Sequence, residues 1–359
     1  MKFLKLYLPG LILFWATCIS AQGKNDTVYK VFQFPANKIP SIDGELSDWK
    51  LVPESYAVKT DQLVDDTKHY DSINKKTIDV SVKVAWIKGL NRLYFLYEAT
   101  DNYWDFSSKD LHHDIFEVVV DGDASGGPFI DRFHPNKKID PMDAWFSYHG
   151  VQAQNYHIYT PNAEMDWTLA WGSQNWIKEL PYANAAYKYS FKPGEAGKLI
   201  LEFWITPFDY AGNTPDRAVE SVLTENKLIG LGWAILDYDD PKNPKQDGFW
   251  NLSRKHTMYG NASELPMFKL MPLEKEFQKA IDAKWSFILL DEKLRQVAFH
   301  DESVGKVSKW LWDFGDGTTS TEQHPVHTYK KPDKYIVTLS VEGEAGSSKL
   351  TKVWDVVVR

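Results

Sequence analysis

The chain has 359 residues, of which 25% are charged and 14% aromatic, including 15 tryptophans. This length and composition predict a globular protein with room for two domains, and they exclude a disordered chain. The formal net charge is −8 and no basic patch with interleaved aromatic residues appears, so nucleic acid is not an expected partner.

The N-terminus reads MKFLKLYLPGLILFWATCISAQG, in which two lysines precede an apolar run and small residues follow it. This pattern predicts a signal peptide over residues 1–21. The run is too short for a comfortable membrane span, so we expect no transmembrane anchor after cleavage and a secreted or surface protein, with the periplasm as an alternative. Cys18, the single cysteine, lies in this leader. Thr17 disfavours a lipoprotein there, and the mature chain then has no thiol for a disulfide, a nucleophile or a metal ligand.

Most of the remaining chain alternates apolar and polar residues with the period of β-strands. The clearest runs cover residues 77–86, 92–99, 114–123, 197–207, 227–240, 335–343 and 348–358. Glycine, proline, asparagine or aspartate bounds each run, which favours an all-β protein built of antiparallel sandwiches. Only residues 272–285 are predicted to be helical, and we expect a linker at 273–282.

Residues 310–329 contain the triplet Asp313-Phe314-Gly315, which in a protein kinase carries the magnesium-binding aspartate. The phosphate loop, strand lysine and catalytic loop of a kinase are missing from the sequence. Asp316-Gly317 follows at once, and Asp-Gly is a strong hairpin signal. We therefore predict a structural turn in which Asp313 and Asp316 accept hydrogen bonds from turn amides.

This segment resembles the PKD domain, an immunoglobulin-like module. The matching residues are 312–317, 324–325, 327–329 and 335–339. The resemblance covers residues 283–359 and implies a small immunoglobulin-like β-sandwich that serves as a spacer or protein-contact module. It also implies that the aspartates brace the turn and that the tyrosine anchors a strand corner.

The larger part of the chain, residues 28–272, resembles family 9 carbohydrate-binding modules. The matching pieces, in order, are residues 39–50, 93–102, 112–123, 198–207, 228–240 and 249–253. The resemblance implies an antiparallel β-sandwich in which a sugar lies between two aromatic rings while polar side chains bind its hydroxyls.

The resemblance also implies individual site residues. Asp114 and Glu117 match the Asp-x-x-Glu of the family's central strand, and Glu117 is the expected acceptor for sugar hydroxyls. The ring expected before them falls on Leu111, so one ring is missing. The remaining candidates are Tyr259 for the late loop, Ser147 and His149 for the polar residues of the next strand, and Trp104, Trp145 or Trp250 for the missing ring.

The tryptophans also have a simpler interpretation, because most of them are expected to fill the core. Trp104 and Trp145 are the two predicted to be exposed, since polar loop sequence surrounds them. Trp167, Trp171 and Trp176 either pack as a loop hairpin or form a platform for a polysaccharide chain.

Two acidic loops offer oxygen ligands for calcium, which the resemblance implies as a structural cation. The first loop contains Asp121, Asp123 and Asp131, and the second contains Asp237, Asp239 and Asp240. Neither loop has EF-hand spacing, and the alternative is that both loops are solvated turns without a bound cation. The histidines at 112, 113, 134 and 149 are read as ordinary surface residues rather than as a transition-metal site.

No hydrolase, metalloprotease or phosphate-loop motif is present. We therefore expect a secreted, non-catalytic protein that binds poly- or oligosaccharide, with an accessory role in glycan degradation. Two alternatives stay open. Related sandwiches bind haem between axial ligands, for which Met142, Met258, Met267 and His149 are available, and an adhesion or scaffold protein would need no small ligand.

Overall fold

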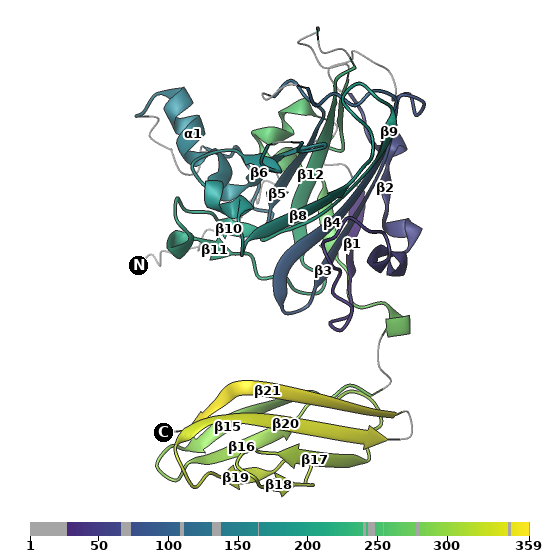
Figure 1. The fold of residues 1–359 in the computed structure, drawn as a ribbon. Helices are drawn as coiled ribbons and strands as arrows, with labels where there is room; N and C mark the ends of the chain where they lie inside the picture. The colour runs from purple at the N-terminus through teal and green to yellow at the C-terminus, as the bar shows by residue number, and fades with distance from the viewer. Residues whose placement is uncertain are drawn as a thin grey trace, which may run out of the picture. The chain divides into compact units, whose positions relative to one another are not determined.

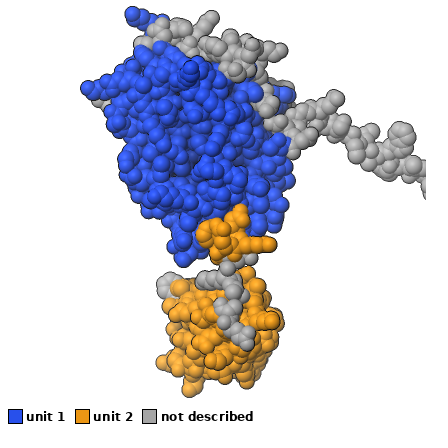
Figure 2. All heavy atoms as spheres, turned by 90° about the vertical axis from the view of Figure 1, so that its right-hand side faces the viewer, with its two compact units in different colours: residues 1–273 blue, residues 274–359 orange. Residues whose placement is uncertain are grey.

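The structure is a computed structural model. It describes residues 27–65, 73–107, 111–130, 138–163, 165–239, 242, 248–253, 255–277, 281–343 and 346–358. The predicted signal peptide, residues 1–21, and Cys18 lie outside the described residues. The chain divides into two compact units, residues 1–273 and 274–359, which Figure 2 colours blue and orange. Both units consist mainly of strands, which confirms the all-β prediction. Within the described ranges, no helix is long and apolar enough to span a membrane.

The first unit is a β-sandwich of two curled layers (Figure 1). One layer has the strand order β7-β6-β5-β12-β14-β1 and the other has the order β1-β3-β4-β9-β8. The strands are β1 (Val28–Gln33), β2 (Val58–Lys59), β3 (Ile78–Ile87), β4 (Leu90–Asp101), β5 (Ile115–Asp121), β6 (Gln154–Tyr159), β7 (Thr168–Ala170), β8 (Ala183–Lys188), β9 (Gly197–Ile205), β10 (Phe208–Tyr210), β11 (Val219–Glu220), β12 (Leu228–Asp237), β13 (Gly248–Asn251) and β14 (Met267–Leu270).

Strand β1 belongs to both layers. Its first four residues pair with β14, and Phe32 and Gln33 then pair with β3. Both pairings are parallel, whereas the sequence predicted antiparallel strands throughout. The other strand pairs of the two layers are antiparallel, so β1 is the strand at which the chain passes from one layer to the other.

The main core lies between the two layers. Val80, Val82 and Val84 of β3 are buried on one face of the strand while Asp79 is exposed, as the alternation predicts. Aromatic rings connect the layers, because Tyr97 of β4 stacks on Phe116 of β5 with ring centroids 4.4 Å apart. Such pairs contribute about 0.5–1.5 kcal/mol beyond their buried area.

The turn in the stretch IDGELSDW is held by a buried carboxylate of β9. Glu202 is fully buried and accepts the indole N–H of Trp49 at 2.6 Å and the amide of Gly44 at 2.7 Å. Gly44 has φ +78° and would bring a Cβ to 3.1 Å from the backbone of Tyr187, so glycine suits this position. These hydrogen bonds therefore attach the loop at residues 42–49 to strand β9 of the second layer.

The helical content differs from the prediction. The one α-helix of the described residues is α1 (Pro141–Gln152), a segment in which no helix was predicted. Asp140 caps it by accepting the amide of Met142 at 2.8 Å, and Pro141 occupies the first turn, which is a recognisable start signal. The helix predicted at 272–285 is wrong, because the described residues of that segment, 272–277 and 281–285, contain only a 3-10 turn, η8 (Lys275–Phe277), before strand β15 begins at Trp285.

The 3-10 turns are short. They are η1 (Asp48–Leu51), η2 (Glu54–Tyr56), η3 (Thr60–Gln62), η4 (Asn175–Lys178), η5 (Pro215–Arg217), η6 (His256–Tyr259), η7 (Ala262–Glu264) and η8 (Lys275–Phe277).

The second unit has a three-stranded sheet, β15-β16-β19, and a four-stranded sheet, β18-β17-β20-β21. The strands are β15 (Trp285–Asp291), β16 (Gln296–Asp301), β17 (Lys309–Asp313), β18 (Thr319–Ser320), β19 (Val326–Thr328), β20 (Asp333–Gly343) and β21 (Gly346–Val358). Trp285, Phe299 and Trp312 meet in its core, with the rings of Trp285 and Trp312 5.6 Å apart. This is the small immunoglobulin-like sandwich that the sequence predicts.

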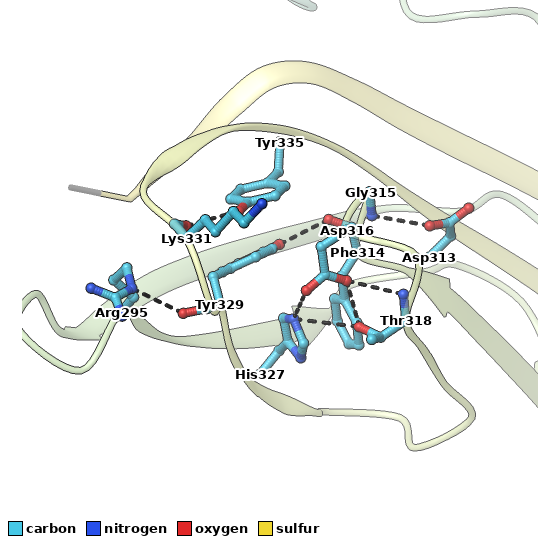
Figure 3. Close-up of polar contacts among 10 residues, drawn as sticks. All are labelled: Arg295, Asp313, Phe314, Gly315, Asp316, Thr318, His327, Tyr329, Lys331 and Tyr335. Atoms are coloured by element: carbon cyan, nitrogen blue, oxygen red, sulfur yellow. Dashed lines mark hydrogen bonds and ion pairs between the residues drawn. The ribbon is translucent and has the colours of Figure 1, made fainter.

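The Asp-Phe-Gly-Asp-Gly turn connects β17 to β18 and is braced as predicted (Figure 3). Asp313 accepts the amide of Gly315 at 3.0 Å, and Asp316 accepts the amide of Thr318 at 3.0 Å. The second carboxylate oxygen of Asp316 accepts Nε2–H of His327 at 2.8 Å. The Asp-Phe-Gly triplet is therefore part of the architecture of this unit.

Two tyrosines hold the strand corner beside this turn (Figure 3). The hydroxyl of Tyr329 donates to the carbonyl of Phe314 at 3.1 Å, and that of Tyr335 donates to the carbonyl of Lys331 at 2.8 Å. Their rings stack with centroids 3.9 Å apart. Arg295 donates from Nε to the Tyr329 carbonyl at 3.0 Å, which ties the preceding hairpin to the same corner.

Candidate functional site

The two faces of strand β5 differ in what they contact. Phe116, Val118 and Val120 point into the main core, whereas Ile115 and Val119 belong to a second apolar cluster on the opposite face. Helix α1 lies near this part of the sheet, beside β6 (Figure 1). Glu117 stands between Ile115 and Val119, so its carboxylate belongs to the second face.

Three polar residues of β5 and β6 meet on that face. Glu117 is 2% exposed, and its Oε1 accepts a hydrogen bond from Asn155 Nδ2 at 2.9 Å. The same oxygen lies 3.8 Å from Nδ1 of His157, which pairs with Glu117 in the sheet register. Trp171 donates its indole N–H to Nδ1 of His157 at 2.6 Å. Glutamate, asparagine and histidine are seldom fully buried, so three such side chains together on one face of two neighbouring strands are unusual.

Helix α1 adds a fourth polar residue. His149 is fully buried, and its Nε2 lies 3.4 Å from Asn155 Nδ2. Its other ring nitrogen, Nδ1, and the side-chain amide oxygen of Asn155, Oδ1, are both buried without a hydrogen-bond partner. A buried polar atom without a partner costs about 1–3 kcal/mol. We call Glu117, His149, Asn155 and His157 the polar niche.

Three aromatic rings surround the polar niche, and each is partly exposed. The ring of Trp145 lies on that of His149 with centroids 3.9 Å apart. Tyr259 of η6 meets Trp145 edge-on at 6.4 Å, and Trp171 meets His149 edge-on at 6.2 Å. The arrangement places flat apolar surfaces at the rim and hydrogen-bonding atoms beneath them.

Both histidines of the polar niche are neutral at pH 7. Burial lowers the pKa of His149 to about 3, and the nearby His157 adds to this effect. Burial also lowers the pKa of His157, against the opposing influence of the Glu117 carboxylate. A neutral imidazole offers one donor and one acceptor, so the polar niche can both give and take hydrogen bonds.

The sequence anticipated part of this arrangement. Of the predicted binding residues, the structure brings together Glu117, Trp145, His149 and Tyr259. His149 and Ser147, however, lie on α1 and not on a strand as expected. Asn155 and His157 were missed, and Trp171 was named only as part of a possible platform with Trp167 and Trp176. A usable signal was present, because Asn155 and His157 stand two positions apart in the strand QNYHIY and therefore share one face of it.

Two predicted ring donors lie in the interior. Trp104 is 1% exposed, stacks on Phe191 with centroids 4.9 Å apart and donates its indole N–H to the Gly197 carbonyl. Its predicted exposure is therefore wrong, because the polar residues beside it bind backbone amides while the ring turns inward. Trp250 is 4% exposed and belongs to the main core cluster.

The three tryptophans at 167, 171 and 176 form neither a mutual cluster nor a platform. Trp167 and Trp176 pack against the main core and donate their indole N–H groups to the carbonyls of Lys178 and Gly212. Of the three, Trp171 alone contacts the polar niche.

The candidate ligands for haem are spread over different environments. Met142 is 61% exposed on α1, whereas Met258 is fully buried in the second apolar cluster and Met267 lies on β14. His149 contacts Trp145, Asn155 and Trp171.

Asp114 has a structural environment apart from the polar niche. Its two carboxylate oxygens accept the amides of Asp105 at 2.7 Å and Tyr238 at 2.9 Å. Burial raises the pKa of its carboxyl well above the usual range, and the carboxylates of Asp101 and Asp237 add to this effect.

The predicted metal ligands that the structure describes lie at two separate positions in the first unit. Asp121 is buried and accepts the amide of Gly126 at 2.8 Å, whereas Asp123 is exposed and accepts the amide of Ser125. Burial raises the pKa of Asp121 to about 7, and Asp123 contributes. Asp237 and Asp239 lie with Asp101, which the sequence did not single out. Asp131, Asp240 and His134 lie outside the described residues.

A hollow of about 410 Å³ lies elsewhere, on the outer side of β3 and β4. Its lining is polar and includes Glu54, Lys59, Asp79, Glu98 and Lys198, with no aromatic residue among the lining side chains. It therefore offers no ring on which a sugar could stack.

Comparison with known proteins separates the two units. Residues 291–358 match the family model of the PKD domain. Among curated proteins, collagenase ColA of Bacillus cereus is 44% identical over 64 residues, 16% of this chain and 7% of that protein. The pre-pro-metalloprotease PrtV of Vibrio cholerae is 47% identical over 47 residues, 13% of this chain and 5% of that protein. The chain thus spans only a small part of these relatives.

Solved structures include likenesses to both units. A family 9 carbohydrate-binding module from Caldicellulosiruptor kristjanssonii, in complex with glucose, aligns with a TM-score of 0.45 at 14% identity, covering 69% of this chain and 98% of that one. The PKD1 domain of Vibrio anguillarum Epp aligns with a TM-score of 0.20 at 25% identity, covering 22% of this chain and 95% of that one. Both resemblances predicted from the sequence are thus found, and the second unit of this chain contains a PKD domain at residues 291–358.

Proposed function

We propose that this chain is an exported, non-catalytic carbohydrate-binding protein and that the polar niche with its three rings binds one sugar residue of a poly- or oligosaccharide. One observation carries the proposal: the buried Nδ1 of His149 and the side-chain oxygen Oδ1 of Asn155 have no partner, and partly exposed rings lie around them. Since native proteins rarely leave such atoms unpaired, a ligand that pairs them is the economical explanation.

A pyranose matches this arrangement chemically. Its C–H face is apolar and stacks on an indole or phenol ring, while its hydroxyl groups both donate and accept hydrogen bonds. Glu117 can accept hydrogen bonds from hydroxyl groups, and the neutral His149 can donate a hydrogen bond to a hydroxyl or accept one from it. No lysine or arginine belongs to the polar niche as defined, which favours an uncharged sugar residue.

Binding includes a movement of the Trp145 side chain. The centroid of this ring lies 3.9 Å from that of His149, so we expect the indole to turn aside when a hydroxyl approaches Nδ1. A small residue faces the ring, because Gly260 would bring a Cβ to 3.6 Å from Trp145. We expect the displaced indole to stack on the sugar and to change its fluorescence on binding.

The chemistry of the polar niche favours binding over cleavage. Glycoside hydrolysis generally requires two carboxyl groups flanking the scissile bond. Glu117 is the one carboxylate in the polar niche as defined, and its nearest polar neighbours are an amide and an imidazole. The PKD domain then acts as a spacer or a protein-contact module beside the binding unit.

A glycan array, followed by affinity electrophoresis in the polysaccharides that bind, tests the proposal on the full chain. Trp145→Ala and Glu117→Gln are expected to weaken retention at least about tenfold, because each removes about 1.4 kcal/mol or more of contact. Tyr189→Ala serves as the control, since this ring is 37% exposed in the same unit and packs on Phe106 and Phe191.

Two results would contradict the proposal in different ways. If the wild-type chain is retained by no polysaccharide of a broad panel, the chain is a scaffold without a small ligand. If a glycan binds but both site variants match the wild type, the protein binds carbohydrate at another place.

A further inference from the structure

One ring nitrogen of the polar niche lies between a hydrogen-bond donor and a carboxylate. Nδ1 of His157 on β6 accepts the indole N–H of Trp171 at 2.6 Å, whereas the same indole nitrogen is 3.4 Å from Nε2. Nδ1 also lies 3.8 Å from Oε1 of Glu117, which is too far for a hydrogen bond. Because Nδ1 accepts, the proton of the neutral imidazole is assigned to Nε2.

Protonation of His157 would exchange these two partners. An imidazolium carries hydrogen on both ring nitrogens, so Nδ1 no longer accepts from Trp171 and becomes a donor. Oε1 of Glu117 then becomes its partner, because a bond between an imidazolium and a carboxylate is about twice as strong as a neutral one. The separation of 3.8 Å needs to shorten by only about 0.6 Å to reach the range of N–H···O bonds.

The groups around His157 place this exchange on the acid side of neutrality. Burial lowers its pKa, against the opposing influence of the Glu117 carboxylate on β5. His149 of α1 is the other titratable group of the polar niche, and burial lowers its pKa to about 3. Strand β7, which pairs with β6 through Leu169, and residues 171–174 carry no charged side chain. His157 is therefore expected to gain its proton below the ordinary value of about 6.5.

We propose that His157 is a positioning residue for sugar binding, which keeps the polar niche open when it is neutral and closes it when it is protonated. The inference rests on the proposed function, in which Glu117 is an acceptor and Trp171 a rim ring. The neutral imidazole fixes the indole at the rim and leaves the carboxylate available to hydroxyl groups. The imidazolium engages the carboxylate and releases the indole, so both contacts with the sugar are lost together.

The expected pH dependence follows from the neutral fraction of His157. When only the neutral form binds, the apparent Kd is the intrinsic Kd divided by that fraction. One pH unit below the pKa, about one tenth of the rings are neutral, so binding of the glycan should be about tenfold weaker there. Well above the pKa, binding should not change with pH.

Two measurements on the full chain test the inference. Affinity electrophoresis from about pH 4 to about pH 8, in a polysaccharide that binds at the upper end, gives the pH profile of binding. NMR of the sugar-free protein with isotope-labelled histidine and tryptophan gives the pKa of His157 and follows the indole N–H resonance of Trp171, which Trp171→Phe assigns. In the wild type, we expect the indole resonance to move and the binding to weaken with the pKa of His157.

Two variants separate the positioning role from simple packing. In His157→Gln the amide oxygen can accept from Trp171, but the side chain takes up no proton, so retention is expected to be the same at both ends of the pH range, whatever its strength. His157→Phe lacks the acceptor and should bind more weakly than the wild type at the upper end. Trp171→Phe removes the bond that favours the neutral ring, so the pKa of His157 should rise in that variant.

The outcomes distinguish this inference from the proposed function. If the wild type binds no polysaccharide, both fail as statements about sugar, and the NMR titration still shows whether the exchange at His157 occurs. If the wild type binds but its pH profile is flat, or His157→Gln has the same profile, the inference alone is overturned. An indole resonance of Trp171 that does not respond to protonation of His157 overturns it as well.

Discussion

The polar niche of the first unit and the braced turn of the second contain similar residues in opposite states. Both place a carboxylate beside histidine and aromatic rings. In the turn, both oxygens of Asp316 accept hydrogen bonds, from Thr318 and His327, and the Tyr329 hydroxyl donates to a carbonyl. In the polar niche, His149 and Asn155 each keep one buried atom unpaired.

The difference extends over the described residues of both units. Buried side-chain polar atoms without a partner occur there in the first unit only. A cluster whose hydrogen bonds are complete contributes to stability, whereas a cluster with open positions costs stability and is retained for another reason. Residue type alone does not distinguish the two, because the same carboxylate–histidine–ring combination serves either purpose.

The largest expected effect is the loss of a core ring from the second unit. Trp312 is fully buried against Trp285 and Phe299, so Trp312→Ala is expected to cost about 3–5 kcal/mol of the free energy of unfolding. Trp145→Ala, at the partly exposed rim of the polar niche, should cost much less. Calorimetry of the full chain measures both, and equal costs would remove the distinction between the two regions.

Two glycines of the braced turn, Gly315 and Gly317, differ in the space around their Cβ positions, which allows a matched pair of alanine variants. Gly315 has φ +78°, and a Cβ there would lie 2.4 Å from the carbonyl oxygen of Ile336. Gly317 has φ +86°, but nothing lies within 4 Å of its Cβ position. Gly315→Ala should therefore cost about 2 kcal/mol or more, and Gly317→Ala only the backbone strain of about 1 kcal/mol. Similar costs by urea unfolding would show that the close contact is unimportant.

The pH dependence of the second unit tests the hydrogen bonds of Asp316. Burial alone would raise the pKa of this carboxyl, but the bonds from Thr318 and His327 outweigh burial and lower it. Because the folded pKa lies below the unfolded value of about 3.9, the stabilisation is fully present above that pH and is lost as the pH falls through the folded pKa. Asp316→Asn is expected to flatten this acid limb, and an unchanged profile in the variant would contradict the assignment.

The smallest effect on stability is expected inside the polar niche. His149→Phe removes a buried ring nitrogen without a partner and leaves the hydrogen bond from Asn155 to Glu117 in place, so the free energy of unfolding should change by less than about 1 kcal/mol while glycan retention is lost. Chemical denaturation and affinity electrophoresis measure the two quantities on the same variant. A large loss of stability would mean that the polar niche is structural, like the turn.

The sequence predicted the structural features that depend on residues close together in the chain. The strands follow from the alternation of residues such as Val80, Val82 and Val84, and the braced turn follows from the Asp-Gly pair at 316–317. Both features are set within a few positions of the chain. The antiparallel layers, the small sandwich and the positions of most strands could therefore be derived before the structure.

What the sequence did not predict depends on distant contacts. The inward turn of Trp104 is set by Phe191 and Gly197, which lie far along the chain. His157 enters the polar niche because β6 pairs with β5, and Asp101 joins Asp237 because two layers end at the same edge. The cap of α1 at Asp140 and Pro141 was readable, but the short helix interrupts a region of strands and was overlooked.

Because β1 belongs to both layers, it affects the stage of synthesis at which the first unit can finish folding. Since β1 pairs with β14 at the far end of the first unit, the layer that contains β14 does not acquire its full set of strands until residue 270 is available. The first unit would therefore remain unfinished for most of its synthesis, because this pairing joins residues that are far apart in the chain. We expect a chain that stops before Met267 to leave the backbone amides of β1 open to hydrogen exchange, while the full chain protects them.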